Sequence, residues 1–256
     1  MRNISAVIIT FNEEKNIERC LNSLISVADE IIVMDSFSTD TTREICGKFD
    51  IKFLQHPFDG YIEQKNRAID AAENDFILSL DADEALSPEL KKSILEIAKI
   101  GIDDSYYFNR LNHYCGNPVR RTDWYPDRKT RLWNRTKGRW GGVNPHDKVI
   151  LSKGVSEKFL KGDLLHFSFN SIEEHLNQSN KFSKISAEQL IIRRKKNLFL
   201  NLIFSPPFKF FKNYFIKLGI LEGFTGFLIS SFIAHETFLK YAKAIHRKRF
   251  SADKSV

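Results

Sequence analysis

The sequence contains few cysteines, and those it has follow no metal-binding spacing. Cys20, Cys46 and Cys115 are an odd set of three in 256 residues, which does not build a disulfide framework. No apolar segment of the signal-peptide kind precedes the first strand-like run, because Met1-Arg2 leads into it directly. We therefore expect a cytoplasmic protein with reduced thiols.

Uncharged runs long enough to cross a membrane are also missing. Asn197–Phe208 and Gly223–Ala234 contain twelve uncharged residues each, whereas a membrane-spanning helix needs about 20. We expect neither run to span a bilayer.

Positive charge is concentrated near the end of the chain. Residues 1–180 carry 24 Lys and Arg against 28 Asp and Glu, a balance of −4, whereas residues 181–256 carry 15 against 4, a balance of +11. Many of the 22 Phe also fall late in the chain. A basic, aromatic end indicates an anionic partner, either nucleic acid or an anionic membrane leaflet.

The first hundred residues alternate strand-like runs with helical patterns. Four strands are expected, at Ile4–Thr10, Glu30–Met34, Ile51–Gln55 and Phe76–Leu80. The helices are expected from Ile17, from the capping-box pattern Thr41–Glu44, over Tyr61–Glu73, and after Ser87-Pro88. This order predicts an α/β fold with a mostly parallel sheet and helices on both faces.

Polar clusters follow three of these strands. Thr10-Phe11-Asn12, Asp35-Ser36 and Asp81-Ala82-Asp83 stand where each strand is expected to end. Ligands of parallel α/β sheets bind beyond the carboxyl ends of the strands. We therefore expect the three clusters to meet in one binding site.

Asp81 and Asp83 have a spacing suited to a divalent cation. Residues two apart at a strand end point the same way, so these carboxylates repel each other unless a cation joins them. Mg²⁺ or Mn²⁺ takes oxygen ligands and shares them with a substrate diphosphate. A solvated acidic turn is the alternative for an isolated triplet of this kind, and the position after a buried fourth strand favours the metal.

Three blocks of this half resemble family-2 inverting glycosyltransferases, which have the Rossmann-like GT-A fold. They are Ala6–Glu14, Ile31–Thr41 and Gly60–Glu84. The phrase Asp35–Asp40, the later His146-Asp147 pair and the basic aromatic end are similar to a bacterial subgroup that adds sugars to the lipopolysaccharide inner core.

The resemblance implies a nucleotide-sugar donor, with UDP-glucose as the first expectation. The donor-binding residues would be, by position, Thr10, Asn12, Glu14, Asp35, Lys65, Asn66, Asp81 and Ala82. Asp83 would be the direct metal ligand, Asp81 would lie near the ribose and the metal, and His166 would be a third ligand. Asn12 and Asp40 fit a helix cap equally well, and His166 fits a hydrogen-bonded core position.

An inverting transfer needs a general base that accepts the proton of the acceptor hydroxyl. Asp147 is our candidate, because it follows a loop containing Gly and Pro, begins an apolar strand and matches the family's His-Glu or His-Asp position. A surface ion pair beside Lys148 is the alternative, and Asp123 and Asp127 are rival candidates. The candidates for contacts to acceptor sugar or phosphate are Trp124, Arg128 and Arg131.

The end of the chain is expected to form a helical, basic, amphipathic extension. Ser171–Arg193 has the pattern of one long helix, and the Phe-rich segment after it is expected to break at Pro206-Pro207. Apolar side chains interleaved with Lys and Arg favour a segment that lies against anionic headgroups. Helices packed on the body are the alternative, and the absence of an RNA- or DNA-binding motif disfavours nucleic acid.

We predict a catalytic domain over residues 1–170, with a nucleotide-sugar half (1–100) and an acceptor half (101–170), and the extension over residues 171–256. The function that fits is a metal-dependent glycosyltransferase, peripheral on the inner face of the cytoplasmic membrane, acting on a lipid-linked glycan such as a lipopolysaccharide or lipooligosaccharide core sugar.

Two alternatives remain open. A sugar nucleotidyltransferase would have a Gly-rich, basic loop where Thr10–Glu14 is acidic and lacks glycine. A non-catalytic membrane-surface protein would not need the carboxylates of Asp35, Asp81, Asp83 and Asp147.

Overall fold

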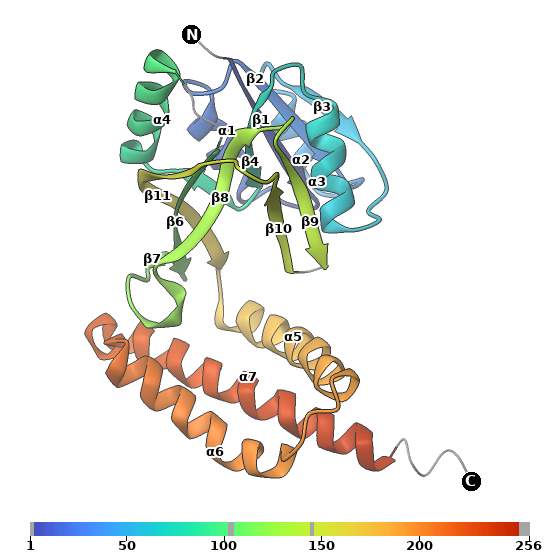
Figure 1. Ribbon diagram of the computed structural model, residues 1–256, viewed down its shortest axis with the longest axis vertical. Coiled ribbons are helices and arrows are strands. Elements are labelled where there is room, and N and C mark those ends of the chain that lie inside the picture. Colours follow the sequence, from blue (N-terminus) through green and yellow to red (C-terminus); the bar gives the residue numbers. More distant parts are fainter. Residues whose placement is uncertain (1–2, 102–104, 144–145, 251–256) are drawn as a thin grey trace. The chain divides into compact units, whose positions relative to one another are not determined.

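The structure, a computed structural model, describes residues 3–101, 105–143 and 146–250, with residues 146 and 250 described by their backbone alone. The chain forms two compact units (Figure 1). The sheet unit comprises Met1–Leu111 and Asp127–Phe167, and the helical unit comprises Asn112–Pro126 and Ser168–Val256. Residues 112–126, expected in the acceptor half, therefore pack with the C-terminal helices.

Strand β1 (Ile4–Thr10) is apolar and almost wholly buried, as a strand covered on both faces should be. It lies at the centre of four parallel strands with β2 (Glu30–Asp35), β3 (Lys52–Gln55) and β4 (Phe76–Asp81), in the order β3-β2-β1-β4. The predicted α/β fold and its four parallel strands are confirmed.

The sheet continues beyond β4 with later strands, in the order β8-β6-β11-β5. Strand β8 pairs antiparallel with both β4 and β6, and β5 pairs antiparallel with β11. The short β7 pairs with β6, and β9 and β10 form a separate hairpin. The bounds are Glu84–Leu86 for β5, Ser105–Tyr114 for β6, Asn117–Pro118 for β7, Asp127–Asn134 for β8, Gly138–Val143 for β9, His146–Leu151 for β10 and Glu157–Phe169 for β11.

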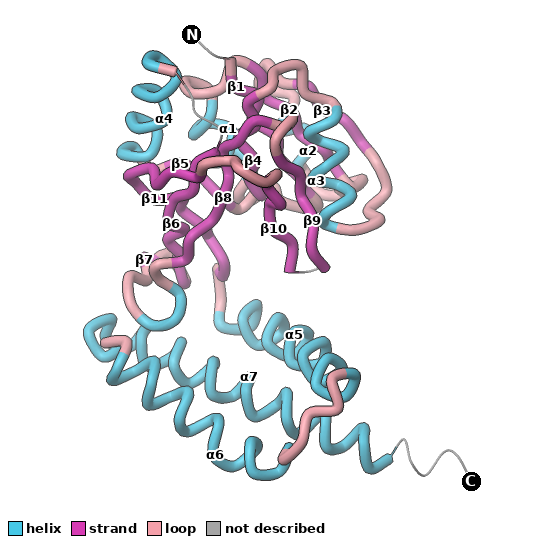
Figure 2. Tube along the Cα trace, in the orientation of Figure 1, coloured by secondary structure: helices cyan, strands magenta, loops and turns pink. Residues whose placement is uncertain are grey.

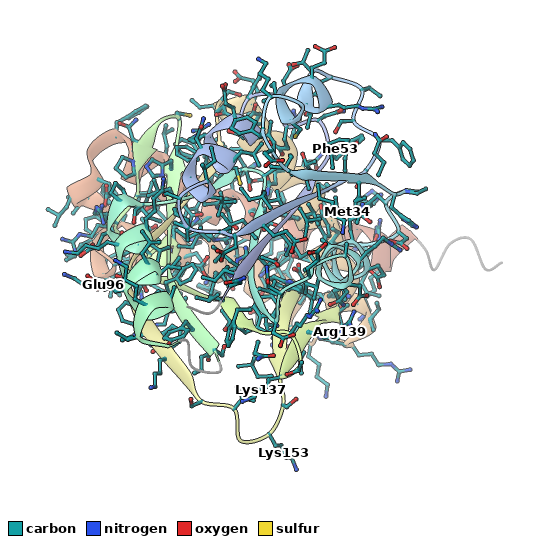
Figure 3. The ribbon with its side chains drawn as sticks, turned by 90° about the horizontal axis from the view of Figure 1, so that it is seen from above. Met34, Phe53, Glu96, Lys137, Arg139 and Lys153 are labelled. Carbon is teal, nitrogen blue, oxygen red and sulfur yellow. The ribbon has the colours of Figure 1, made fainter. Side chains whose placement is uncertain are left out.

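Helices cover both faces of the parallel strands. On one face, α1 (Ile17–Leu24), α2 (Thr42–Cys46) and α4 (Pro88–Ile100) share a buried apolar cluster with β1 and β4. On the other face, α3 (Tyr61–Asp70) and the β9–β10 hairpin enclose Trp133 and Trp140, which are core residues. In Figure 3, Met34 of β2 lies within the packed interior, whereas Lys153 extends from the turn after β10.

The helix starts are set by single polar side chains. The Ser87 hydroxyl accepts a hydrogen bond from the N–H of Leu90 at 3.2 Å, so Ser87 caps α4 as predicted. The capping box expected at Thr41 is wrong, because its hydroxyl donates to Glu14 instead. The carboxylate of Asp40 accepts the N–H of Thr42 at 3.0 Å and takes over the capping role.

The helical unit is built mainly from α5 (Ile172–Ile192), α6 (Leu198–Phe211) and α7 (Gly223–Phe250), as Figure 2 shows. Helix α7 packs against both of the others. The break expected at Pro206-Pro207 is wrong, because α6 continues through both prolines. Each proline removes a backbone donor from the helix, and packing against α7 along its length holds α6 together.

A small aromatic core joins residues 112–126 to these helices. Trp124 lies against Tyr114, Phe169 and His175, with ring centroids 5.8–5.9 Å apart. Burial lowers the pKa of His175 to about 4, so the imidazole is neutral near pH 7 and suits an apolar cluster. Trp124 is therefore a packing residue of the helical unit.

Helix α6 is apolar and yet has no buried residue. Its exposed side chains include Phe199, Phe204 and Phe208, which are 65%, 66% and 60% exposed. Among the described helices, none is by itself long and apolar enough for a membrane span; only Leu198–Ile216 together with Gly219–Arg249, bent by 72°, passes on length and composition.

Candidate functional site

The three polar strand ends meet at one edge of the sheet. In the register of the parallel strands, Thr10 lies beside Asp35, and Ile9 lies beside Asp81. The carboxyl ends of β1, β2 and β4 therefore converge, which is the position at which ligands bind in sheets of this kind.

The loop after β1 is fastened to the loop after β2. Asn12 has a φ of 55°, a left-handed conformation that asparagine tolerates, and its side chain accepts a hydrogen bond from the N–H of Thr39 at 2.8 Å. The carboxylate of Glu14 accepts from the hydroxyl of Thr41 at 2.8 Å. Asn12 is thus a loop clamp and not the cap of α1, which begins after Asn16.

Asp35 is buried at the base of these loops. Its carboxylate accepts from the N–H of Ser38 and from the side-chain amide of Gln55, both at 2.9 Å. Within the described residues, the neighbouring buried hydroxyl of Thr10 has no hydrogen-bond partner. A buried hydroxyl without a partner is costly, and a ligand that reaches between these loops could satisfy it.

Lys65 joins two carboxylates that lie far apart in the sequence. Its ammonium nitrogen is 2.8 Å from Oδ2 of Asp147 and 3.0 Å from Oδ1 of Asp81. The ring of Trp140 lies below it, 4.2 Å from the nitrogen. The Lys65 side chain is only 5% exposed, so water does not replace its two carboxylate partners. Lys65 therefore fixes the distance between Asp81 and Asp147.

Arg131 holds the other oxygen of Asp81. It is buried and lies 3.0 Å from Oδ2 of Asp81 and 2.7 Å from Oε1 of Glu84. Burial alone would raise the pKa of Asp81, but the charges of Lys65 and Arg131 outweigh it and hold that pKa far below its ordinary range. Asp81 is therefore ionised and shared between two cations.

Asp83 forms a different pair. Its Oδ2 atom lies 3.1 Å from Nε2 of His166, and both side chains are partly exposed, by 28% and 17%. Two ligands of one octahedral cation are also about 3 Å apart, given metal–ligand bonds near 2.1 Å. Asp83 and His166 thus fit two neighbouring positions around Mg²⁺ or Mn²⁺.

The protein alone does not complete a metal site in the part of the chain that the structure describes. No group of three or more His, Cys, Asp or Glu is arranged to hold a cation there. Asp81, expected as a second ligand, is instead bonded to Lys65 and Arg131. Metal sites that act on nucleotides often use one or two protein ligands and take the remainder from phosphate and water, which agrees with this arrangement.

Glu13 lies near the same carboxylates. Burial raises its pKa to about 7, a hydrogen bond from Asn16 opposes that rise, and the charge of Asp83 adds to it. Sequence reasoning missed Glu13, although it stands between Asn12 and Glu14. It also missed Glu84, although that residue directly follows the Asp81–Asp83 triplet.

Other predicted site residues have structural partners. Both ends of the Asn66 amide bond the backbone of Trp140, at 2.9 and 3.1 Å, so Asn66 fastens α3 to β9. Ala82 is buried, and the exposed Arg128 lies 5.7 Å from the ring of Tyr107. Arg131 is a partner of Asp81 and Glu84, not an exposed phosphate contact.

The rival bases are engaged elsewhere. Asp127 pairs with Arg110 at 2.8 Å and with Lys129 at 3.1 Å. Asp123 belongs to the helical unit, where it accepts a hydrogen bond from Asn213 and is surrounded by Lys209, Lys212 and Lys217. Asp147 differs, because within the described residues only its Oδ2 atom is bonded and Oδ1 has no partner.

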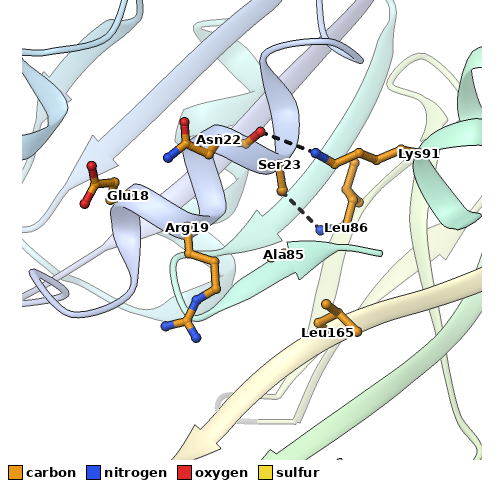
Figure 4. Close-up of a pocket in the computed structure, with 8 residues that line it drawn as sticks. All are labelled: Glu18, Arg19, Asn22, Ser23, Ala85, Leu86, Lys91 and Leu165. Atoms are coloured by element: carbon orange, nitrogen blue, oxygen red, sulfur yellow. Dashed lines mark hydrogen bonds between the residues drawn. The ribbon is translucent and has the colours of Figure 1, made fainter. Parts of the chain in front are cut away.

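A shallow pocket of about 490 Å³ lies between α1, β5 and the start of α4 (Figure 4). Its lining includes Arg19 and Asn22 of α1, Lys91 of α4 and Leu165, the neighbour of His166. The guanidinium of Arg19 stacks over the ring of Phe167 at 3.5 Å. The lining therefore contains two cations, Arg19 and Lys91, and one carboxylate, Glu18.

The chain is similar to known proteins over most of its length. The model of the family described as glycosyl transferase family 2 matches residues 5–161. An uncharacterized glycosyltransferase of Rickettsia bellii is 36% identical over 252 residues, covering 94% of this chain and 86% of the relative. The lipopolysaccharide core biosynthesis glycosyltransferase LpsC of Rhizobium meliloti is 30% identical over 260 residues, covering 99% and 96%.

Among solved structures, similarity extends to residues 1–349 of S. aureus TarS, with a TM-score of 0.44 and 16% identity over 97% of this chain and 92% of that one. Glucosyl-3-phosphoglycerate synthase from Mycobacterium tuberculosis, in complex with Mn²⁺ and UDP-glucose, has a TM-score of 0.37 and 24% identity, covering 44% of each chain.

Proposed function

The chain belongs to glycosyl transferase family 2, and from that premise we propose that it is an inverting, metal-dependent enzyme that moves a hexose from a nucleotide-sugar to a lipid-linked glycan. The observation that carries the proposal is the position of Lys65. Its ammonium group contacts both Asp81, at the end of β4, and Asp147, so one cation links the two carboxylates. The donor side and the base side of the proposed transfer would thereby be joined in one site.

The donor would lie along the ends of β1, β2 and β4. The Thr10 hydroxyl and the clamped loops of Asn12 and Glu14 would line the nucleoside pocket, and Asp35 would lie near the nucleobase of the donor. Asp83 and His166 would hold a divalent cation, which would neutralise the charge of the departing diphosphate. We propose a UDP-hexose as the donor and UDP-glucose as the first one to test.

Asp147 would be the general base. Its Oδ2 atom is held by Lys65, which leaves Oδ1 to act as the base. Oδ1 would accept the proton of the acceptor hydroxyl while the hydroxyl oxygen attacks the anomeric carbon of the donor sugar. Lys65 would not take part in proton transfer itself. It would keep Asp147 at a fixed distance from Asp81, so that base and donor meet in one geometry.

The acceptor would be a glycan carried on a lipid, such as a lipopolysaccharide core sugar. The similarity to LpsC over nearly the whole of both chains supports this choice. The pocket lined by Arg19, Lys91 and Glu18 would offer two cations to a phosphorylated acceptor sugar. The exposed phenylalanines of α6, together with the basic end of α7, would keep the enzyme on the inner face of the cytoplasmic membrane.

Donor binding can be tested by thermal unfolding of the intact protein with a panel of nucleotide-sugars, with Mn²⁺ or with EDTA. A donor present at one hundred times its Kd stabilises the folded state by about 2.7 kcal/mol. We expect UDP-glucose to raise Tm only with Mn²⁺, and Asp83→Ala to abolish that rise.

Asp70→Ala is the matched control, because Asp70 forms an exposed pair with Arg139 and should leave the donor response intact. A Tm rise that is the same with EDTA, or that survives in Asp83→Ala, would contradict the metal assignment. Absence of transfer from every nucleotide-sugar to lipid-linked acceptors would contradict the reaction.

A further inference from the structure

A second group of charged residues lies in the helical unit, between α5 and α7. It lines a pocket of about 630 Å³ and contains Lys181 and Lys184 of α5 with Lys243, His246 and Arg247 of α7. We call this set the basic pocket. No described carboxylate is among the residues that line it.

The contacts inside the basic pocket divide its cations into two kinds. Lys243 is anchored, since its ammonium donates to the carbonyl and side chain of Asn180 and to the hydroxyl of Ser183, at 2.6–2.8 Å. Burial lowers its pKa, and the neighbouring charges of Lys184 and Arg247 lower it further. Lys181 and Lys184 are exposed, and within the described residues neither has a carboxylate partner.

Arg247 has one nearby counter-charge, Glu188, at 2.7 Å. A second carboxylate, Glu236, acts on Lys243 and opposes the fall of its pKa. Two carboxylates do not balance the four cations Lys181, Lys184, Lys243 and Arg247, and like charges held by helix packing repel one another. An anion that carries two charges and several acceptor oxygens would relieve this repulsion and accept from Lys181, Lys184 and the remaining donors of Arg247. A phosphate monoester has these properties, whereas a phosphodiester carries one charge.

The surroundings favour a phosphate that is attached to a lipid. The last turns of α7 line a second pocket, of about 420 Å³, through Ile245, Lys248 and Arg249. The other wall of that pocket includes Lys196 and the exposed Phe199 at the start of α6. Cations, the exposed ring of Phe199 and the half-buried Ile245 therefore lie together at one helix end, which matches the boundary between phosphate headgroups and acyl chains.

We propose that the basic pocket is a binding site for a phosphate monoester on a membrane lipid. This inference rests on the membrane location proposed above, and it adds a defined headgroup site to it. The bound phosphate would contact Lys181 and Lys184, while Lys243 supplies a fixed charge behind them.

The test uses the full-length protein and sedimentation with two kinds of vesicle. Phosphatidylcholine vesicles contain either phosphatidic acid, a monoester, or phosphatidylglycerol, a diester, at contents that give equal zeta potential. We expect tighter binding to phosphatidic acid. The double variant Lys181→Gln and Lys184→Gln should weaken that binding by at least about tenfold and abolish the preference.

The control is Lys48→Gln with Lys153→Gln, which removes the same charge from exposed positions of the sheet unit. It should retain the preference for phosphatidic acid. Equal binding to both vesicles, or a preference that survives in the Lys181 and Lys184 variant, would overturn the proposal.

Two further arms identify the source of the anion. If glycerol 3-phosphate binds as tightly as phosphatidic acid, the pocket is a site for a soluble phosphate ester. If RNA binds more tightly than phosphatidic acid and displaces the protein from the vesicles, the pocket is a nucleic-acid site. Both results contradict a lipid site. The double variant should keep the Mn²⁺-dependent Tm response to UDP-glucose, so a failure of this inference can be told from a failure of the proposed reaction.

Discussion

The two units use their charges in opposite ways. In the sheet unit, buried Lys65 and Arg131 are neutralised by carboxylates of the same unit, and every oxygen of Asp81 is shared with a cation. In the helical unit, Lys181 and Lys184 lie exposed around a pocket that has no described carboxylate in its walls.

Apolar side chains divide in the same way. Strands β1 and β4 are buried along nearly their whole length, whereas α6 contains no buried residue. The buried charges of Lys65, Asp81 and Arg131 are thus paired within the sheet unit, which fixes their positions as a preorganised site requires. The helical unit leaves the ammonium groups of Lys181 and Lys184 and the apolar side chains of α6 exposed.

The largest effect that would sharpen this comparison is expected at Asp147. Asp147→Asn removes the proposed base but keeps the shape of the side chain, and we expect kcat to fall by about a thousandfold with little change in the donor KM. Steady-state transfer assays measure this, and vesicle binding should not change.

Asp123→Asn is the control, because Asp123 pairs with lysines of the helical unit. That variant should retain turnover. Near-normal turnover of Asp147→Asn would show that the base had been assigned to the wrong carboxylate.

The buried ion network is the next point of difference. Arg131→Met leaves Asp81 and Glu84 without their shared guanidinium, and we expect the free energy of unfolding to fall by about 3 kcal/mol. Urea denaturation measures the loss. Arg139→Met removes an exposed pair with Asp70 and should cost less than about 1 kcal/mol; equal losses in the two variants would argue against an internally neutralised unit.

Substitutions on the surface of the helical unit should weaken vesicle binding and leave donor binding unchanged. Phe204→Ser with Phe208→Ser removes two exposed apolar side chains, and we expect binding to anionic vesicles to weaken by about thirtyfold. Donor-dependent Tm shifts should be unchanged. Phe58→Ser with Phe159→Ser removes similarly exposed rings from the sheet unit, which are 52% and 48% exposed, and should leave vesicle binding intact.

The smallest effect concerns Glu13. Its pKa is raised by burial to about 7 from an ordinary value of 4.5, so the folded chain holds a proton that the unfolded chain has lost between these pH values. Stability therefore falls as the pH rises through that range. Glu13→Gln should stabilise the metal-free protein by about 1 kcal/mol at pH 8 and by almost nothing at pH 4.5; an equal gain at both values would exclude this account.

The first hundred residues could be predicted well because their information is local. Apolar runs, turn residues and the Asp81–Asp83 triplet each lie within one segment, and the parallel arrangement follows from their order. The sequence also identified Lys65 and Asp147 separately. It could not join them, because the contact between them depends on where the β9–β10 hairpin packs.

Other errors arose where tertiary contacts override local preference. Pro206 and Pro207 favour a helix end, yet α6 passes through them against α7. Arginine side chains are usually exposed, so the sequence did not indicate that Arg131 is buried. The pairing of β8 with β4 brings it to Asp81. The site as a whole could therefore be predicted as a set of strand ends, but not as an ion network.

Because α6 has no buried residue, we expect it to tolerate more amino-acid substitutions than the buried strands of the sheet. Each residue of β4 must fit a defined volume against its neighbours, so few replacements are tolerated there. Along α6, one exposed apolar side chain can replace another at little cost to folding, so we expect only the average apolar character of this surface to be constrained. A saturation mutagenesis library should accordingly return a narrow set of residues at Leu78 and Leu80, and a broad but apolar set at Phe199, Ile203 and Phe204.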